Sequence, residues 1–217
     1  GRPARRPGRP AEDRKSGVFP RKATGRYASA HADASHFSNV KGQVTVENCL
    51  FEGMMDDAIN VHSTCLFVTN VVAPNAIRCR YMHPQAVGFD IFLPREKLRF
   101  IDGDTLETGP EVVVAEVVRH DAREVTLTLD RPLPEGFGVG DAVENADYQC
   151  AATFRGNTVR FNRARGTLFT TPKPVLIESN LFDRVSGSAI LYAGDAHYWF
   201  ESGACRKSVI RGNVFRN

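Results

Sequence analysis

Several features are scarce or missing in the sequence, and each absence excludes a class of protein. No apolar run reaches the length that a membrane-spanning helix needs, so we expect no membrane span. The five cysteines form no CxxC pair, which argues against a structural zinc site. Two of them, Cys49 and Cys65, lie in apolar runs and are interpreted as small core residues. No amphipathic helix of useful length is found, and what remains is a globular composition, 42% hydrophobic and 24% charged over 217 residues.

The formal charge of +3 comes largely from the start of the chain. Residues 1–24 are interpreted as a basic, proline-rich arm that is either disordered or a truncated coil. A nucleic-acid-binding arm would need matching basic clusters elsewhere. None is seen, so we expect no nucleic-acid partner.

Both ends of the chain are interpreted as cuts. The sequence begins at Gly1 without an initiator methionine or a signal peptide, and it ends at Asn217 inside a repeat. We therefore expect a fragment of a longer protein.

A repeated asparagine motif predicts the fold. Four short strand patterns, at 46–51, 154–159, 177–182 and 210–215, are interpreted as placing an asparagine at the same point. From Asn157 to Asn180 is 23 residues, the length of one solenoid coil. Stacked coils share a core that no single coil could bury, which predicts a parallel β-helix. We expect Asn48, Asn157, Asn180 and Asn213 to form a ladder at a left-handed corner. A β-sandwich, the alternative fold, gives no reason for the recurrence.

A long interruption separates the first copy of the motif from the second. The segment 67–148 contains strand patterns at 87–93, 111–118 and 125–129, divided by glycine- and proline-rich turns. It predicts an inserted small antiparallel β-barrel module. Residues 25–66 and 149–217 are then the β-helix coils, and the whole chain is all-β.

Three aspartates are the candidate catalytic residues. Asp33 and Asp57 are 24 residues apart, one coil, so we expect them to stack on neighbouring coils. Like charges held so close raise one pKa, which suits a general acid and base. Asp56 adds a third carboxylate. The alternatives are solvated surface charges, or a Ca²⁺ site, which would need further oxygen ligands.

Histidines and a looped-out segment are candidates for sugar binding. His36 and His62 either donate hydrogen bonds to a sugar or are half-buried structural residues. The segment 194–203 interrupts the coil rhythm and carries Tyr198, Trp199 and Glu201. Aromatic rings stack on sugar faces and carboxylates hold hydroxyls, although a hydrophobic plug is an equal reading.

These residues resemble a known family. The segments 32–37, 47–52, 56–62, 187–190 and 194–203 closely resemble the α-1,3-galactosidases of glycoside hydrolase family 110, and the resemblance runs from about Gly17 to Asn217. It implies a right-handed parallel β-helix interrupted by barrels. Members have several hundred residues, which implies that upstream coils are missing here.

The resemblance also implies an activity. It implies removal of terminal α-1,3-linked galactose, as in blood group B or linear α-galactosyl glycans, with inversion and without a metal or cofactor. The partner is then a galactose-terminated oligosaccharide or glycoconjugate, and the location is secreted or periplasmic; a homo-oligomer is left open. The catalytic acids match Asp33, Asp56 and Asp57. The substrate-binding residues are His36, Asn60, His62, Asp195, Tyr198, Trp199 and Glu201.

The mechanism that follows is a single displacement. We favour Asp56 as the acid and Asp57 with Asp33 as the base side, which needs carboxyls about 6.5–9.5 Å apart. A polygalacturonase-like enzyme is an alternative, but it should line its groove with arginine or lysine, and we expect no basic residue beside Asp56 and Asp57. A non-catalytic β-helix adhesin or binding module is the other alternative, but it has no reason to stack acids.

Overall fold

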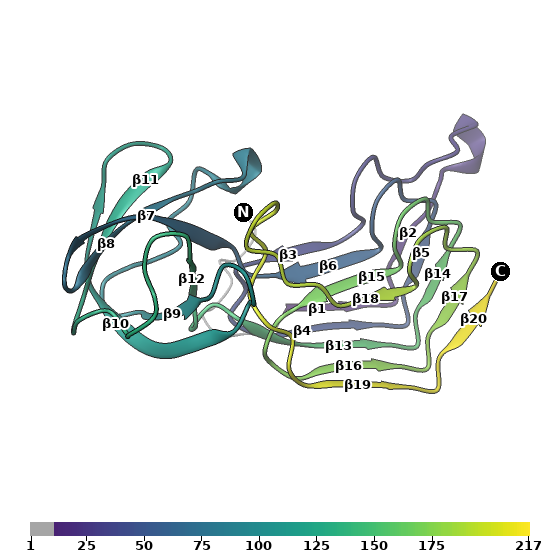
Figure 1. The fold of residues 1–217 in the computed structure, drawn as a ribbon. Coiled ribbons are helices and arrows are strands. Elements are labelled where there is room, and N and C mark those ends of the chain that lie inside the picture. Colours follow the sequence, from purple (N-terminus) through teal and green to yellow (C-terminus); the bar gives the residue numbers. More distant parts are fainter. Residues whose placement is uncertain (1–10) are drawn as a thin grey trace, which may run out of the picture. The chain divides into compact units, whose positions relative to one another are not determined.

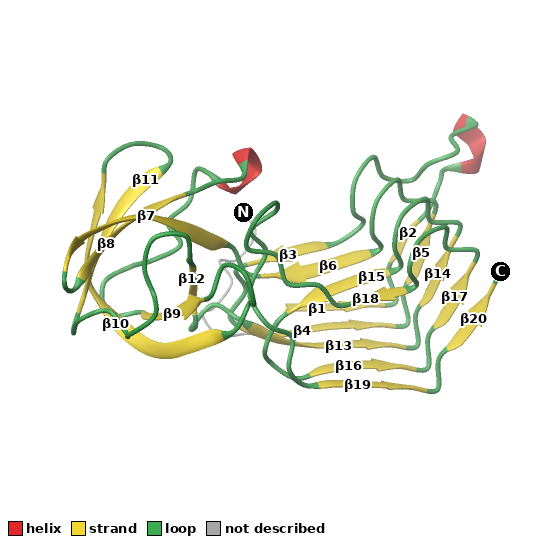
Figure 2. Ribbon diagram, in the orientation of Figure 1, coloured by secondary structure: helices red, strands yellow, loops and turns green. Residues whose placement is uncertain are grey.

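The computed structural model describes residues 11–217, which form two compact units. The first unit takes in the chain up to Val61 together with Cys150–Ala193 and Cys205–Asn217, and the second takes in His62–Gln149 and Gly194–Ala204. Figure 2 shows strands and loops almost throughout; the helices of the described chain are two 3₁₀ turns, Lys22–Thr24 and Pro84–Ala86. Neither turn has the length or apolar character to cross a membrane.

The first unit is built from successive passes of the chain that each add a strand to a sheet (Figure 1). One parallel sheet has the order β1 (Ala11–Arg14), β4 (Gly42–Glu47), β13 (Cys150–Arg155), β16 (Val175–Glu178), β19 (Ser208–Arg211). A second parallel sheet has the order β2 (Gly17–Val18), β5 (Leu50–Glu52), β14 (Thr158–Arg160), β17 (Leu181–Asp183), β20 (Val214–Arg216). A third has the order β18 (Ile190–Leu191), β15 (Thr167–Thr170), β6 (Ile59–His62), β3 (His36–Ser38).

Short strands with one inward apolar residue explain this stacking. The central residues of β5, β14 and β17 are buried and in register, so Phe51, Val159 and Phe182 form one column of the core. Phe215 continues the column, with its ring 5.4 Å from that of Phe182 and nearly parallel to it. A single pass cannot bury such a residue, so each strand depends on its neighbours above and below.

The expected asparagine ladder is confirmed for three of its four members. The backbone N–H of Asn157 donates to Oδ1 of Asn180 at 2.9 Å, and that of Asn180 donates to Oδ1 of Asn213 at 2.9 Å. The amide groups also donate along the ladder and to backbone carbonyls, such as that of Phe154. Buried backbone polar groups at the corner are thereby satisfied.

The prediction that Asn48 is the fourth member of the ladder is wrong by one position. The strand register pairs Glu47 with Arg155, and it is Cys49 whose N–H donates to Oδ1 of Asn157, at 2.8 Å. Asn48 is exposed and has a φ of 56°. The left-handed corner therefore precedes the ladder position in each pass, as Gly156, Ser179 and Gly212, all with φ near 60°, also show.

Part of the predicted basic arm is a strand pass. Ala11–Arg14 and Gly17–Val18 pair in parallel with β4 and β5. Strands pair through backbone N–H and C=O groups, and a charged residue carries these groups just as an apolar residue does. The rest of the arm, residues 1–10, lies outside the described residues.

The second unit contains the predicted antiparallel barrel (Figure 1). The barrel is closed, in the order β10 (Thr108–Arg119), β11 (Glu124–Leu129), β8 (Ala76–Arg80), β7 (Cys65–Ala73), β12 (Ala142–Asn145), β9 (Lys97–Ile101). Its strands alternate as a half-buried sheet requires: Val125, Leu127 and Leu129 of β11 are buried, and the residues before them are not. The chain leaves β6 to build the barrel and resumes at β13, which pairs with β4.

The segment Gly194–Ala204 groups with the barrel unit, whereas the sequence predicts it within the coil segment 149–217. The backbone N–H of Cys65 donates to the carbonyl of Phe200 at 2.8 Å, and the N–H of Gly203 donates to Oε2 of buried Glu144 at 3.1 Å. The Phe200 ring packs edge-on against Phe67, with centroids 6.2 Å apart. This segment is therefore an ordered loop of the second unit.

Candidate active site

The three predicted acids converge within the first unit. One oxygen from each of Asp33, Asp56 and Asp57 lies within 4.8 Å of the others. Asp33 precedes β3, while Asp56 and Asp57 precede β6, the neighbouring strand. The N–H of Asp57 donates to Oδ1 of Asp33 at 3.0 Å, and the N–H of Ala34 donates to the carbonyl of Asp57 at 2.9 Å. The one-coil spacing thus places the acids side by side, as expected.

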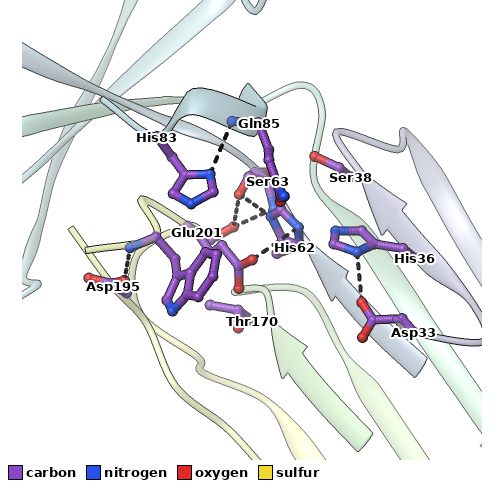
Figure 3. A network of polar contacts seen from close by, with 12 residues as sticks. Asp33, His36, Ser38, His62, Ser63, His83, Gln85, Thr170, Asp195 and Glu201 are labelled. Atoms are coloured by element: carbon purple, nitrogen blue, oxygen red, sulfur yellow. Dashed lines mark hydrogen bonds and ion pairs between the residues drawn. The ribbon is translucent and has the colours of Figure 1, made fainter. Parts of the chain in front are cut away.

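Asp33 is held at both oxygens. Oδ1 accepts the N–H of Asp57, and Oδ2 lies 2.8 Å from Nδ1 of His36 (Figure 3). The His36 side chain is nearly half exposed, whereas the Asp33 side chain is mostly covered. Asp33 therefore links the backbone of buried Asp57 to the imidazole of His36.

Asp57 is the buried member of the trio. Its residue surface is 0% exposed, and its Oδ2 has no hydrogen-bond partner among the described residues. Burial raises the pKa of Asp57 to about 6, against the lowering by its bond to Arg165; the charges of Asp33 and Asp56 raise it further. A carboxyl with a pKa near 6 is mostly ionised at neutral pH and can still take up a proton, which suits a general base.

A basic residue, Arg165, lies against the acids, and the expectation that no base stands beside them is wrong. Its Nε is 2.7 Å from Oδ1 of Asp57, and its NH2 nitrogen is 3.4 Å from Oδ1 of Asp56. Arg165 precedes β15, the strand next to β6. Sequence reasoning missed it because 108 residues separate it from Asp57, with the barrel in between.

Asp56 faces solvent more than the other two. Its side chain is 48% exposed and has one weak ion pair, that with Arg165. Among the three acids it is the one placed to meet a ligand directly.

The trio offers hard oxygen donors, but a cation would compete with bonds already made. Both oxygens of Asp33 and one of Asp57 have partners, and Arg165 supplies positive charge. A Ca²⁺ ion takes six to eight oxygens, so these residues fit it poorly. They fit proton transfer better, because one buried and two partly exposed carboxyls share one place.

Asn60 is buried on β6 rather than presented to a ligand. Its N–H donates to the carbonyl of Ser35 at 2.9 Å, and its Oδ1 has no hydrogen-bond partner among the described residues. A sugar would reach this amide only after the surrounding chain moved.

Four of the predicted binding residues lie in the loop of the second unit, and a fifth, His62, contacts it. His62 places Nε2 3.5 Å from Oε1 of Glu201, while its Nδ1 lies 2.7 Å from the carbonyl of Ser63 (Figure 3). A nitrogen that faces a carbonyl carries a proton, so Nδ1 of His62 donates to the carbonyl of Ser63. The hydroxyl of Ser202 accepts the N–H of Ser63 at 2.5 Å, which fixes the loop beside the imidazole.

Asp195 shapes this loop. Its Oδ1 accepts the N–H groups of His197 and Tyr198, both at 2.8 Å, and its Oδ2 accepts that of Trp199. Burial acts to raise the pKa of Asp195, but these backbone bonds outweigh it and the pKa is lowered. The Asp195 carboxylate therefore accepts backbone hydrogen bonds within the loop, while the side chains of Tyr198 and Trp199 are exposed to solvent.

Two aromatic rings are exposed on the loop. Tyr198 is 73% exposed and Trp199 48%, and the two rings meet edge to face. The His83 ring lies 4.6 Å from that of Trp199 and is tilted by 41° to it, so the indole has a ring contact on the protein. Exposed, supported rings of this kind are what a sugar face stacks on.

Comparison with known proteins adds to this geometry. Residues 76–143 match the family model described as GLAA-B beta-barrel domain II. The chain is 59% identical over 201 residues to an alpha-1,3-galactosidase B of Akkermansia muciniphila, covering 93% of this chain and 25% of that protein. It is 44% identical to an alpha-1,3-galactosidase B of Bacteroides fragilis (88% of this chain, 34% of the relative) and 43% identical to one of Phocaeicola vulgatus (88% and 33%). The chain thus spans about a quarter to a third of the length of these relatives.

Proposed function

We propose that the chain carries the catalytic acids of an α-1,3-galactosidase that removes terminal α-linked galactose from glycans. The observation that carries the proposal is the convergence of Asp33, Asp56 and Asp57, with one oxygen of each inside 4.8 Å and a pKa near 6 on the buried member. Like charges held this close repel one another, and that repulsion costs stability in the folded state. The names of the relatives supply the substrate class.

Within the trio we assign roles by exposure. Asp56 is the exposed carboxyl and is proposed to protonate the leaving oxygen. Asp57, with its pKa near 6, is proposed to activate water, and Asp33 holds Asp57 through its N–H. Asp→Asn at any of the three is expected to lower turnover by at least about a hundredfold, the scale of acid–base catalysis.

We propose an inverting course, which the resemblance in the catalytic segments implies. The spacing favours the opposite course, because facing oxygens within 4.8 Å lie nearer than the about 6.5–9.5 Å of an inverting pair. Proton NMR of the first-formed product decides between them. An initial β-galactose supports inversion, and an initial α-galactose refutes the roles given to Asp56 and Asp57.

A second candidate has one observation in its favour. Arg165 lies beside the acids, as expected of an enzyme that acts on an acidic polysaccharide. The assay should therefore include polygalacturonate beside α-1,3-, α-1,4- and α-1,6-linked galactosides. Hydrolysis of the α-1,3 linkage alone supports the galactosidase, and hydrolysis of polygalacturonate alone supports the alternative. Binding without turnover, unchanged by Asp→Asn, supports a non-catalytic module.

The finer structural and cellular assignments are also proposals. We propose that the first unit is part of a right-handed parallel β-helix of glycoside hydrolase family 110, with the barrel inserted between β6 and β13; one strand per sheet per pass supports this. Blood group B or linear α-galactosyl glycans are the proposed substrates, and the secreted or periplasmic compartment the proposed location. His36, Tyr198 and Trp199 are exposed and are the proposed sugar contacts.

A further inference from the structure

Three adjacent strands of the third sheet deliver charged residues to one place. Asp33 comes before β3, Asp57 before β6 and Arg165 before β15, and these strands are neighbours in that order. The three residues occupy the same turn of successive passes. The strand order that brings Asp33 and Asp57 together therefore also places Arg165 beside them.

We infer that Arg165 is a positioning residue, which holds Asp57 and Asp56 in a fixed relative orientation for the reaction. The inference rests on the proposed function. Arginine presents several N–H donors in a rigid plane, so one guanidinium can hold two carboxylates at a set angle. Here Nε meets Oδ1 of Asp57 at 2.7 Å, and a terminal nitrogen reaches Oδ1 of Asp56 at 3.4 Å.

This arrangement also leaves a specific oxygen for chemistry. Arg165 occupies Oδ1 of Asp57, whereas Oδ2 of Asp57 is unpartnered among the described residues. The guanidinium therefore selects which oxygen takes up the proton. A lysine would carry the same charge as a point and could not grip both acids in one plane.

The charges around Asp57 define the electrostatic role. The groups that face it are Arg165, which favours the ionised form, and Asp33 and Asp56, which oppose it; His36 is bonded to the far oxygen of Asp33. Burial by itself would keep the carboxyl protonated at higher pH. Arg165 is thus what keeps a buried acid available as a base near neutral pH.

The test compares three variants of the full chain. Arg165→Gln removes both the positive charge and the planar set of N–H donors. Arg165→Lys keeps the charge but loses the planar donors. Arg163→Gln is the matched control, since Arg163 lies in the same turn and reaches the same neighbouring pass, but bonds the carbonyl of Met55 at 2.9 Å. The readouts are the titration of the Asp57 carboxyl by ¹³C NMR and the pH profile of galactoside hydrolysis.

We expect Arg165→Gln to raise the Asp57 pKa by about one unit or more, the scale of losing an adjacent opposite charge. The acidic limb of kcat/KM should move up with it, and kcat should fall by about tenfold or more through lost orientation. Arg165→Lys should keep the titration near that of the parent and still lower kcat. Arg163→Gln should match the parent in both.

A folded Arg165→Gln variant in which Asp57 titrates as in the parent would overturn the inference. Should that variant not fold, Arg165→Lys decides: parent-like kcat refutes a positioning role, and lowered kcat with an unshifted titration supports it. If the parent hydrolyses no galactoside, the proposed function fails on its own. The NMR titration still shows whether Arg165 controls Asp57.

Discussion

Oδ1 of Asp33 accepts the backbone N–H of Asp57 at 3.0 Å, so an acid of one pass anchors the turn that carries the acids of the next. Asp33→Asn keeps an acceptor at this place but removes the charge. We expect the Asp57 pKa to fall below about 6, because the Asp33 charge raises it, and kcat to fall by at least about a hundredfold. Asp33→Ala should in addition lower the free energy of unfolding by about 1–3 kcal/mol, the cost of an unsatisfied buried donor. Parent-like turnover in Asp33→Asn would remove Asp33 from the base side.

The raised pKa of Asp57 predicts how stability depends on pH. The folded pKa of about 6 exceeds the ordinary 3.8, so the native state binds this proton more tightly than the unfolded state does. The contribution of Asp57 is therefore greatest below about pH 4 and is lost as the pH rises through 6, by on the order of 3 kcal/mol. Asp57→Asn, neutral throughout, should gain stability relative to the parent over this window in urea unfolding. The exposed control Asp104→Asn should follow the parent, and a parent-like slope in Asp57→Asn would contradict the prediction.

The asparagine ladder predicts different costs at two asparagines. Asn180→Ala removes the acceptor of the Asn157 N–H and the donor to Phe154, and should cost about 2–3 kcal/mol of unfolding free energy. Asn48→Gly should change it by about 0.5 kcal/mol or less, because Asn48 is exposed and its φ of 56° suits glycine. Chemical denaturation of both variants checks this. Equal costs would mean that Asn48 belongs to the ladder after all.

Trp199 is the only tryptophan in the sequence, so fluorescence excited where tyrosine does not absorb reports on its position alone. We expect α-galactosides to quench or shift this signal in a saturable way if the exposed indole stacks on the sugar. Trp199→Ala should weaken binding by about three- to tenfold in calorimetry, on the usual scale of an aromatic contact, and Trp199→Phe should keep part of the affinity. If both variants unfold at midpoints near that of the parent, the loss of affinity comes from the lost sugar contact and not from a damaged fold. Binding that Trp199→Ala leaves unchanged would favour the hydrophobic-plug reading.

Local patterns in the sequence determined much of the architecture. Alternating apolar residues predicted short strands, and the recurrence at Asn157, Asn180 and Asn213 predicted a ladder, since stacking repeats a residue once per coil. The turn-rich interruption predicted the antiparallel barrel. The 24-residue interval between Asp33 and Asp57 equals one pass, so their meeting could be read directly from the spacing.

The register across the barrel was decided by the tertiary structure. Contacts between the two sides of the insertion share one separation of 108 residues: Glu47 with Arg155, Cys49 with Asn157, Glu52 with Arg160, Met55 with Arg163, Asp57 with Arg165. Pairing Asn48 with Asn157 assumed one residue more, which shifted the first copy of the motif by one place. Insertions of many lengths can join the same two coil strands, so no local sequence pattern specifies the separation of 108 residues.

The chemistry depends on that register. Arg165 meets Asp57 because β15 resumes beside β6 after the barrel, and nothing near either residue in the sequence points to the other. Burial of Asp57 and exposure of Asp56, adjacent in sequence, likewise follow from how neighbouring passes cover one side chain and leave the other. The sequence by itself therefore determined which acids gather, and the tertiary structure decided which of them is buried, which is exposed and which cation holds them.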